Sequence, residues 1–188
     1  MNKLKIPAFL ATCVLASLLS ANTFAQAVQN NSWALYLQYG AAEHGTDTQT
    51  AGVLLPWKHW SHELGSGLLT GHWDIWGSRW ASDYQNRTRS SWVIGAKPTL
   101  RWRGAQGQSP WFIEAGVGVS YALNHRYLSD FREFSTRYNF ASHIGVGYLF
   151  GPQQKNEISL RLEHQSNAGI KQPNPGENFL QLRYARYF

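Results

Sequence analysis

The sequence has almost no cysteine or methionine, and it has only one long apolar run. The only cysteine, Cys13, lies within that run near the amino terminus, and the only methionine is Met1. Once the terminal segment is removed no thiol remains, so disulfides cannot stabilise the rest of the chain. Beyond it, no stretch has the roughly 18 apolar residues that a membrane helix needs. These absences exclude a disulfide-rich scaffold and a bundle of membrane helices.

The amino-terminal segment has the pattern of an export signal. Lys3 and Lys5 precede an apolar run at 8–19, and small residues follow at Ala25 and Ala27. We predict a signal peptide at residues 1–25, or 1–27 with the later cleavage site, and one domain at 28–188. Because residues 1–27 hold two lysines and no acidic residue, their removal changes the formal charge from +6 to +4. This mild basic excess suits an anionic membrane surface or an acidic ligand.

Aromatic residues and glycine are abundant, and apolar residues alternate with small or polar ones along the mature chain. The chain has nine Trp, nine Tyr, nine Phe and 17 Gly. Alternation is clearest at 111–123, where Trp111, Ile113 and Val117 share one face and small or glycine residues share the other. This pattern predicts eight strands at 33–41, 49–57, 63–73, 91–103, 111–123, 139–150, 157–167 and 178–188.

Eight strands of roughly 10 residues match the tilted span of a small outer-membrane barrel. The connections expected after the first, third, fifth and seventh strands are mostly long and polar, including 74–90, and the others are short. That alternation is typical of extracellular loops and periplasmic turns. We therefore predict an all-β protein, an eight-stranded antiparallel transmembrane β-barrel of the bacterial outer membrane. A secreted soluble barrel that binds a small apolar ligand is the architectural alternative.

Two polar side chains interrupt the apolar face of the seventh predicted strand. His164 and Ser166 have the parity of Leu160 and Leu162, so they point to the lipid side, near the outer leaflet. A histidine can take the proton that makes a serine hydroxyl nucleophilic. The alternative is that both are ordinary residues at the rim of the barrel, where polar groups are tolerated.

A catalytic triad also needs a carboxylate that orients the histidine. Glu177 lies just before the strand that pairs with the seventh one, but its parity is that of the lumen. It reaches His164 only if Gly176 and the neighbouring prolines reset the chain. The reserve candidates are Asp130 and Glu133 in the loop before the sixth strand.

The segment His164-Gln165-Ser166-Asn167-Ala168, followed by 170–174 and by Glu177-Asn178, resembles the signature of the PagL-type lipid A 3-O-deacylases. The resemblance implies an outer-membrane esterase that removes the 3-O-linked 3-hydroxyacyl chain of lipid A, the substrate being lipopolysaccharide in the outer leaflet. It implies His164 as base, Ser166 as nucleophile, Glu177 as orienting acid and Asn167 in the oxyanion hole. It implies no cofactor.

Other partners are less sharply indicated. Arg126, Arg132 and Arg137 lie in a predicted extracellular loop and are candidate contacts for lipid A phosphates, with solvated loop charge as an equally weighted alternative. No histidine has a ligand-spaced partner that predicts a metal site. We expect outer-membrane lipids around the barrel and no nucleic acid, and we consider a homodimer. The functional alternative is a non-catalytic small barrel that serves adhesion or membrane integrity.

Overall fold

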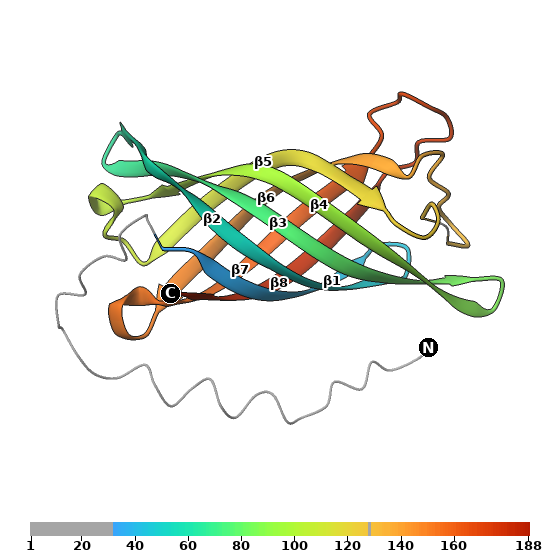
Figure 1. Ribbon diagram of the computed structural model, residues 1–188, viewed down its shortest axis with the longest axis horizontal. Helices are drawn as coiled ribbons and strands as arrows, with labels where there is room; N and C mark the ends of the chain where they lie inside the picture. The colour runs from blue at the N-terminus through green and yellow to red at the C-terminus, as the bar shows by residue number, and fades with distance from the viewer. Residues whose placement is uncertain (1–31, 128) are drawn as a thin grey trace.

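The computed structural model describes residues 32–127 and 129–188, so the predicted signal peptide lies outside the described residues. Eight antiparallel strands form a closed barrel in which each strand pairs with its sequence neighbours and β8 pairs with β1 (Figure 1). The strands are β1 (Ala34–Ala42), β2 (Thr46–Leu64), β3 (Gly67–Tyr84), β4 (Arg87–Arg103), β5 (Trp111–Ala122), β6 (Tyr138–Phe150), β7 (Asn156–Ser166) and β8 (Glu177–Tyr187). Two short 3₁₀ turns, η1 (Ala105–Gly107) and η2 (Pro152–Gln154), precede β5 and β7. The eight-stranded barrel predicted from the sequence is confirmed.

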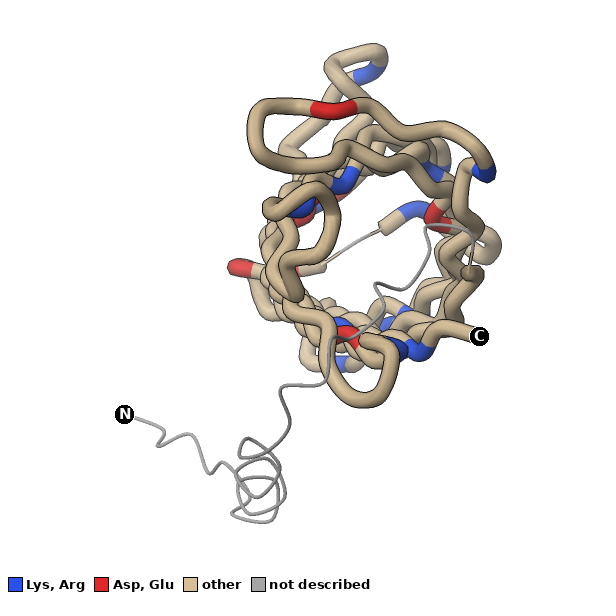
Figure 2. The backbone as a smooth tube through the Cα atoms, turned by 90° about the vertical axis from the view of Figure 1, so that its left-hand side faces the viewer, with Lys and Arg blue, Asp and Glu red and all other residues tan. Residues whose placement is uncertain are grey.

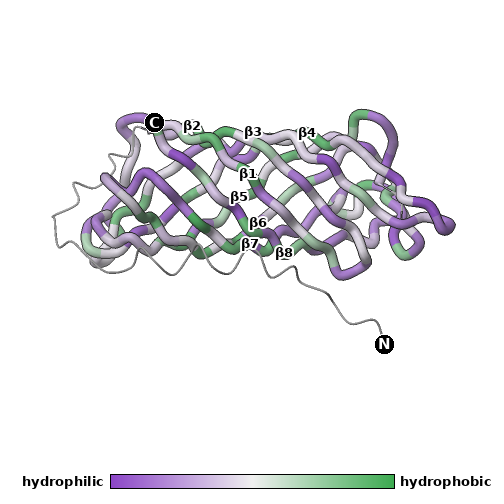
Figure 3. Tube along the Cα trace, turned by 90° about the horizontal axis from the view of Figure 1, so that it is seen from below, coloured by the Kyte–Doolittle hydropathy of each residue, from purple (hydrophilic) through white to green (hydrophobic). Residues whose placement is uncertain are grey.

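The strand alternation places apolar residues outside and polar residues inside. On β1, Leu37 is 68% exposed whereas its neighbours Tyr36 and Gln38 are 4% and 7% exposed. Hydrophilic and hydrophobic positions follow one another along the strands in Figure 3. A soluble barrel would bury its large apolar residues, so this inverted arrangement is that of a barrel surrounded by lipid. Within the described ranges, no helix is long and apolar enough to cross a membrane.

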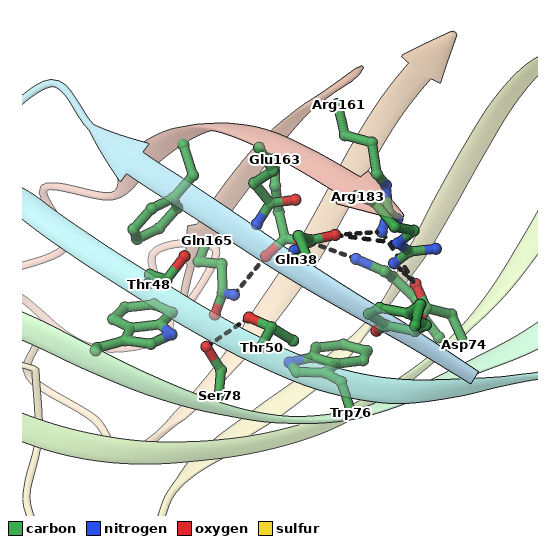
Figure 4. Close-up of a pocket in the computed structure, with 15 residues that line it drawn as sticks. Gln38, Thr48, Thr50, Asp74, Trp76, Ser78, Arg161, Glu163, Gln165 and Arg183 are labelled. Atoms are coloured by element: carbon green, nitrogen blue, oxygen red, sulfur yellow. Dashed lines mark hydrogen bonds and ion pairs between the residues drawn. The ribbon is translucent and has the colours of Figure 1, made fainter. Parts of the chain in front are cut away.

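The interior is filled by charged side chains that pair across the barrel (Figure 4). Asp74 on β3 accepts hydrogen bonds from Arg161 at 3.3 Å and Arg183 at 2.8 Å, and both arginines also donate to the side-chain oxygen of Gln38. Burying one such charge alone would be costly, whereas mutual pairing offsets the loss of hydration. Seen from the end that carries the carboxyl terminus, acidic and basic positions are distributed around the ring (Figure 2). The interior is thus a packed polar core.

The glycine-rich inner face of β5 and β6 makes room for this core. A Cβ on Gly147 would lie 2.1 Å from the Phe112 ring, and one on Gly145 would lie 3.0 Å from Arg161 Cγ. The sequence pattern correctly predicted small residues on this face. It did not predict that long charged side chains from the neighbouring strands occupy the space that they leave.

Three strands are longer than predicted. Most of the segment 74–90, expected to be a long connection, continues β3 and β4, which join through Gln85 and Asn86 alone. Both residues have positive φ, 51° and 60°, as in the type I′ turns that suit a twisted hairpin. Asp74, Ser78 and Ser82 of this segment alternate into the lumen, so their polarity did not mark a loop. The short connection expected between the predicted strands 49–57 and 63–73 lies within β2, at an irregularity between Pro56 and Ser61.

The seven connections between strands are divided between the two ends of the barrel. The β1–β2, β3–β4, β5–β6 and β7–β8 connections lie together at the right in Figure 1, and the carboxyl terminus lies at the left with the other three connections. The β5–β6 and β7–β8 loops, at 123–137 and 167–176, are the longest connections of the right-hand end. They surround the outer end of β7, which carries His164 and Ser166.

Candidate active site

The outer end of β7 is held in place from inside the barrel. The Gln165 side chain donates to Glu163 Oε1 at 2.7 Å and accepts from Ser120 Oγ at 2.7 Å. Glu163 also pairs with the buried ammonium group of Lys97. Since alternate residues face opposite sides of the wall, anchoring Glu163 and Gln165 inside fixes His164 on the outer face. A rigid strand therefore presents this histidine toward the surroundings of the barrel.

His164 takes its partner from the neighbouring strand β8. Its Nδ1 lies 2.8 Å from Asn178 Oδ1, and the two residues are directly opposite in the β7–β8 register. Because an amide oxygen can only accept, Nδ1 carries the proton and Nε2 is the free acceptor. A neutral imidazole in this tautomer is a base whose lone pair faces away from Asn178.

Gly176 lies directly against the imidazole ring of His164. Its φ is +67°, and a Cβ built there would lie 2.7 Å from His164 Cε1 and 3.3 Å from Nε2. A side chain at this position would therefore displace the ring, and the positive φ is itself easily adopted only by glycine. The glycine lets the backbone of the β7–β8 loop approach the Cε1–Nε2 edge of the imidazole.

Ser166, half-buried at the end of β7, follows two residues after His164. Its Oγ accepts a long hydrogen bond, 3.5 Å, from the backbone N–H of Ala168. Among the contacts of the described residues, the serine and histidine side chains do not hydrogen-bond to each other. Such bonds are often long in enzymes without substrate and shorten in the reactive complex.

Glu177 is not brought to His164. Its carboxylate points into the barrel, where Oε1 lies 3.1 Å from His44 Nδ1 and Oε2 accepts from the Tyr127 hydroxyl at 3.0 Å. The expected reset of the chain at Gly176 does not occur, because β8 alternates regularly from its first residue and pairs Glu177 with Gln165. The carboxylate predicted to orient the histidine is thus a buried group that links the β8 start to the loops.

Tyr127 is the loop residue that completes this buried cluster. Its hydroxyl lies 2.5 Å from Thr46 Oγ1 as well as within hydrogen-bonding distance of Glu177. Burial raises the pKa of Tyr127 to about 12. The phenol therefore stays protonated at neutral pH and can donate to the carboxylate.

Asn167 is fully engaged in holding the β7–β8 loop. Its side-chain nitrogen donates to Ser135 Oγ at 2.9 Å and to the Lys171 carbonyl at 2.8 Å, while its Oδ1 accepts from Gly169 N–H at 3.0 Å. The side chain is buried with these partners rather than directed at the serine. Its position shapes the turn that follows Ser166.

That turn contains strained backbone beside the serine. Ala168 and Gly169 have φ of 53° and 79°, and the Ile170 N–H bonds to the Asn167 carbonyl at 3.1 Å, a type I′ arrangement. Alanine adopts positive φ only at a cost, and such strain is often found at functional sites. Here it aims the Ala168 N–H at Ser166 Oγ.

The loop arginines have intramolecular partners. Arg126 donates to the Ser135 carbonyl and pairs with Glu133, Arg132 lies against the His44 ring, and Arg137 donates to the carbonyls of Ala122 and Leu123. The reserve acid Asp130 accepts from the Gln85 backbone N–H at 2.8 Å. Neither Asp130 nor Glu133 lies beside His164 in the described contacts. Over the same residues, there is no group of three or more metal-ligating side chains.

Sequence reasoning missed Asn178 and Gly176. The parity rule contained the signal for Asn178, since this residue shares the outward parity of β8 and lies opposite His164. The preference for a carboxylate directed attention to Glu177 instead. The role of Gly176 depends on the loop path, which the sequence does not reveal.

Comparison with known proteins agrees with the barrel fold. The family model for lipid A 3-O-deacylase (PagL) matches residues 48–187. Proteins named lipid A deacylase PagL are similar to the chain: that of Bordetella bronchiseptica is 33% identical over 154 residues, covering 81% of this chain and 82% of the relative. That of Pseudomonas aeruginosa is 30% identical over 145 residues, covering 77% and 80%.

A solved structure described as the outer membrane enzyme PagL superposes with a TM-score of 0.71 at 27% identity, covering 82% of this chain and 99% of that one. The family match extends over most of the barrel and includes β7, the β7–β8 loop and the start of β8. The chain therefore belongs to the lipid A 3-O-deacylase (PagL) family.

Proposed function

We propose that this protein is an outer-membrane serine esterase that hydrolyses the 3-O-linked 3-hydroxyacyl chain of lipid A. Membership of the family supports the reaction. The observation that carries the proposal for this chain is that His164 and Ser166 stand on the lipid-facing side of a rigid strand, with Nδ1 of His164 fixed by Asn178. A substrate embedded in the outer leaflet can reach such a site without entering the lumen.

In the proposed mechanism, Nε2 of His164 removes the proton of Ser166 as Oγ attacks the ester carbonyl. Asn178 holds the imidazole in the required tautomer and rotation through the bond to Nδ1. His164 then gives its proton to the sugar oxygen that leaves. Water, activated by the same histidine, releases the 3-hydroxy fatty acid from the acyl-enzyme.

The oxyanion is stabilised in this proposal by backbone N–H groups of the turn after Ser166. The Ala168 N–H, 3.5 Å from Oγ, is the nearest such donor. Asn167 acts by holding the turn through Ser135 and Lys171, a positioning role in place of the direct contact that we expected.

Arg126 is the loop cation best placed to exchange its partner for a lipid A phosphate. Its ion pair with Glu133 is 3.4 Å long, and both side chains are about half exposed. Such surface pairs contribute little to stability and are readily replaced. Arg132 and Arg137 are more firmly tied to His44 and to backbone carbonyls, so their role as phosphate contacts is a weaker proposal. A homodimer is a separate proposal, which crosslinking in lipid vesicles would test.

Mass spectrometry of lipid A from cells that express the protein tests the proposed reaction. We expect the wild type to remove one 3-hydroxyacyl group and Ser166→Ala to abolish this loss. Ser142→Ala is the matched control, because Ser142 lies opposite His164 on β6 and shares its outward face. Unchanged lipid A in membranes that contain folded wild-type barrel, judged by heat-dependent gel migration, would refute the esterase and leave a non-catalytic barrel.

A further inference from the structure

A cavity of about 50 Å³ lies inside the barrel at the end that carries the carboxyl terminus. Three of its lining residues, Arg103, Leu149 and Tyr187, lie at the end of their strands or one residue before it. Tyr187 is only half-buried, so the cavity is close to this mouth of the barrel. The cavity is far from His164, because Tyr187 lies nine residues along β8 from Asn178, the partner of His164, which is about 30 Å.

The buried charges of the barrel interior do not balance at this end. Glu177 lies at the opposite mouth, with His44. The remaining buried charges of the described chain are five cations, Lys97, Arg101, Arg103, Arg161 and Arg183, and four carboxylates, Asp74, Glu114, Glu157 and Glu163. Lys97 pairs with Glu163, Arg101 pairs with Glu114 and Glu157, and Arg161 and Arg183 pair with Asp74. Every carboxylate of this set is therefore engaged by a cation other than Arg103.

Arg103 is left without a counter-charge. Its guanidinium donates to the Ser109 carbonyl at 2.9 and 2.7 Å and to Gln154 Oε1 at 2.6 Å, all of which are neutral oxygens. Among the described residues it forms no ion pair, although it is only 4% exposed. A buried charge without a partner of opposite sign is costly, so this position favours an anion beside the guanidinium.

His72 offers a second unused polar group to the same cavity. It is 8% exposed and lines the cavity together with Arg103. Over the described part of the chain, its Nε2 is buried without a hydrogen-bond partner. A neutral imidazole that carries its proton on Nε2 donates a hydrogen bond there. The cavity thus combines an uncompensated guanidinium with an N–H donor, and these are groups that bind anions.

We propose that this cavity binds one small inorganic anion, such as chloride or phosphate, between Arg103 and His72. One water-sized sphere takes about 10–15 Å³ of such space, so the cavity admits a small ion but excludes a larger organic anion. The bound anion neutralises Arg103, links β4 to β3 and stabilises this mouth of the barrel. The site is independent of the proposed esterase reaction, because His164 lies toward the opposite end.

The test measures the thermal unfolding midpoint of purified, refolded barrel in detergent. Chloride or inorganic phosphate replaces gluconate, an anion too large for the cavity, at constant ionic strength. We expect the wild-type midpoint to rise saturably, by roughly 3–6 °C at ten times the dissociation constant. Arg103→Gln should abolish the rise, and His72→Phe should weaken binding about tenfold because it removes one donor to a charged group. Arg186→Gln is the matched control, because Arg186 is an exposed arginine on the outer face of β8 at the same end.

Each outcome decides for or against the anion site. A wild-type midpoint that is the same in gluconate, chloride and phosphate would mean that the cavity holds water alone and would overturn the proposal. An equal rise in Arg103→Gln would place the anion elsewhere and would overturn it too. If Arg103→Gln does not fold, His72→Phe decides, and an unchanged dissociation constant in that variant refutes the site. A rise that is lost in Arg103→Gln, weakened in His72→Phe and kept in Arg186→Gln supports it.

Discussion

We predict that Asn178, and not Glu177, orients His164, the proposed catalytic base. The perturbation that tests this is a pair of adjacent substitutions, Asn178→Ala and Glu177→Gln. In the first variant the Nδ1–H of His164 loses its partner at 2.8 Å, whereas in the second the imidazole keeps it. Glu177 is on the other side of the barrel wall, bonded to His44 and Tyr127.

The magnitude follows from the nature of the hydrogen bond to Asn178. A bond to a group that becomes charged in the transition state contributes about 1.5–3 kcal/mol. This corresponds to a loss of about tenfold to a hundredfold in kcat for Asn178→Ala. Because His164 and Asn178 are both exposed, we expect the lower part of this range. Glu177→Gln should leave kcat nearly unchanged, whereas removing the carboxylate of a true triad costs about 10⁴-fold.

A third variant, Asn178→Asp, gives the sign of the electrostatic effect. A carboxylate near His164 stabilises the imidazolium, which the reaction forms, so kcat should rise on the alkaline side. The same charge favours the inactive protonated base in the free enzyme. At about 4 Å in a high dielectric the attraction is about 1 kcal/mol, so the acid limb of the pH–rate profile should move up by roughly one pH unit.

The assay is the release of 3-hydroxy fatty acid from lipid A in detergent micelles, normalised to the folded fraction seen by gel migration. The pH dependence of kcat/KM is recorded for each variant. A loss of about 10³-fold or more in Glu177→Gln, together with wild-type activity in Asn178→Ala, would refute the reasoning. It would mean that the start of β8 rearranges when substrate binds and brings Glu177 to the histidine.

Two further predictions concern the surroundings of this pair. Gly176→Ala should lower kcat more than Gly169→Ala does, because both glycines have positive φ but only at Gly176 would a Cβ meet the His164 ring; equal losses, measured in the same fatty-acid assay, would contradict this. Burial raises the pKa of Tyr127 from 10 to about 12, so the folded state retains this proton and loses stability as the pH rises through that window. Thermal unfolding of refolded protein should show a smaller loss between pH 10 and 12 in Tyr127→Phe than in the wild type, although Tyr127→Phe removes the bond to Glu177 and is less stable at neutral pH.

The sequence predicted the barrel because each strand carries its own inside and outside alternation. That local pattern placed His164 and Ser166 outward without knowledge of any other strand. The polar core was not predictable in the same way. Asp74 finds its partners Arg161 and Arg183 at separations of 87 and 109 residues, and only ring closure brings them together. The β3–β4 hairpin resembled a polar loop because buried Asp74, Ser78 and Ser82 alternate there with outward polar residues such as Arg79 and Asp83.

The partner of His164 shows that strand parity decides which neighbouring side chain can reach a given residue of a barrel. The family resemblance and the need for a carboxylate favoured Glu177, since a carboxylate is the stronger partner of an imidazolium. Strand parity excluded it unless the backbone was reset, and β8 alternates without interruption from Glu177 onward. In a hairpin whose register is fixed by inward contacts on both strands, a one-residue shift would carry Phe179 out of the core and Asn178 into it. The barrel wall therefore separates the two neighbours: Glu177 stabilises the loops from within, and Asn178 holds the histidine on the face that meets the lipid.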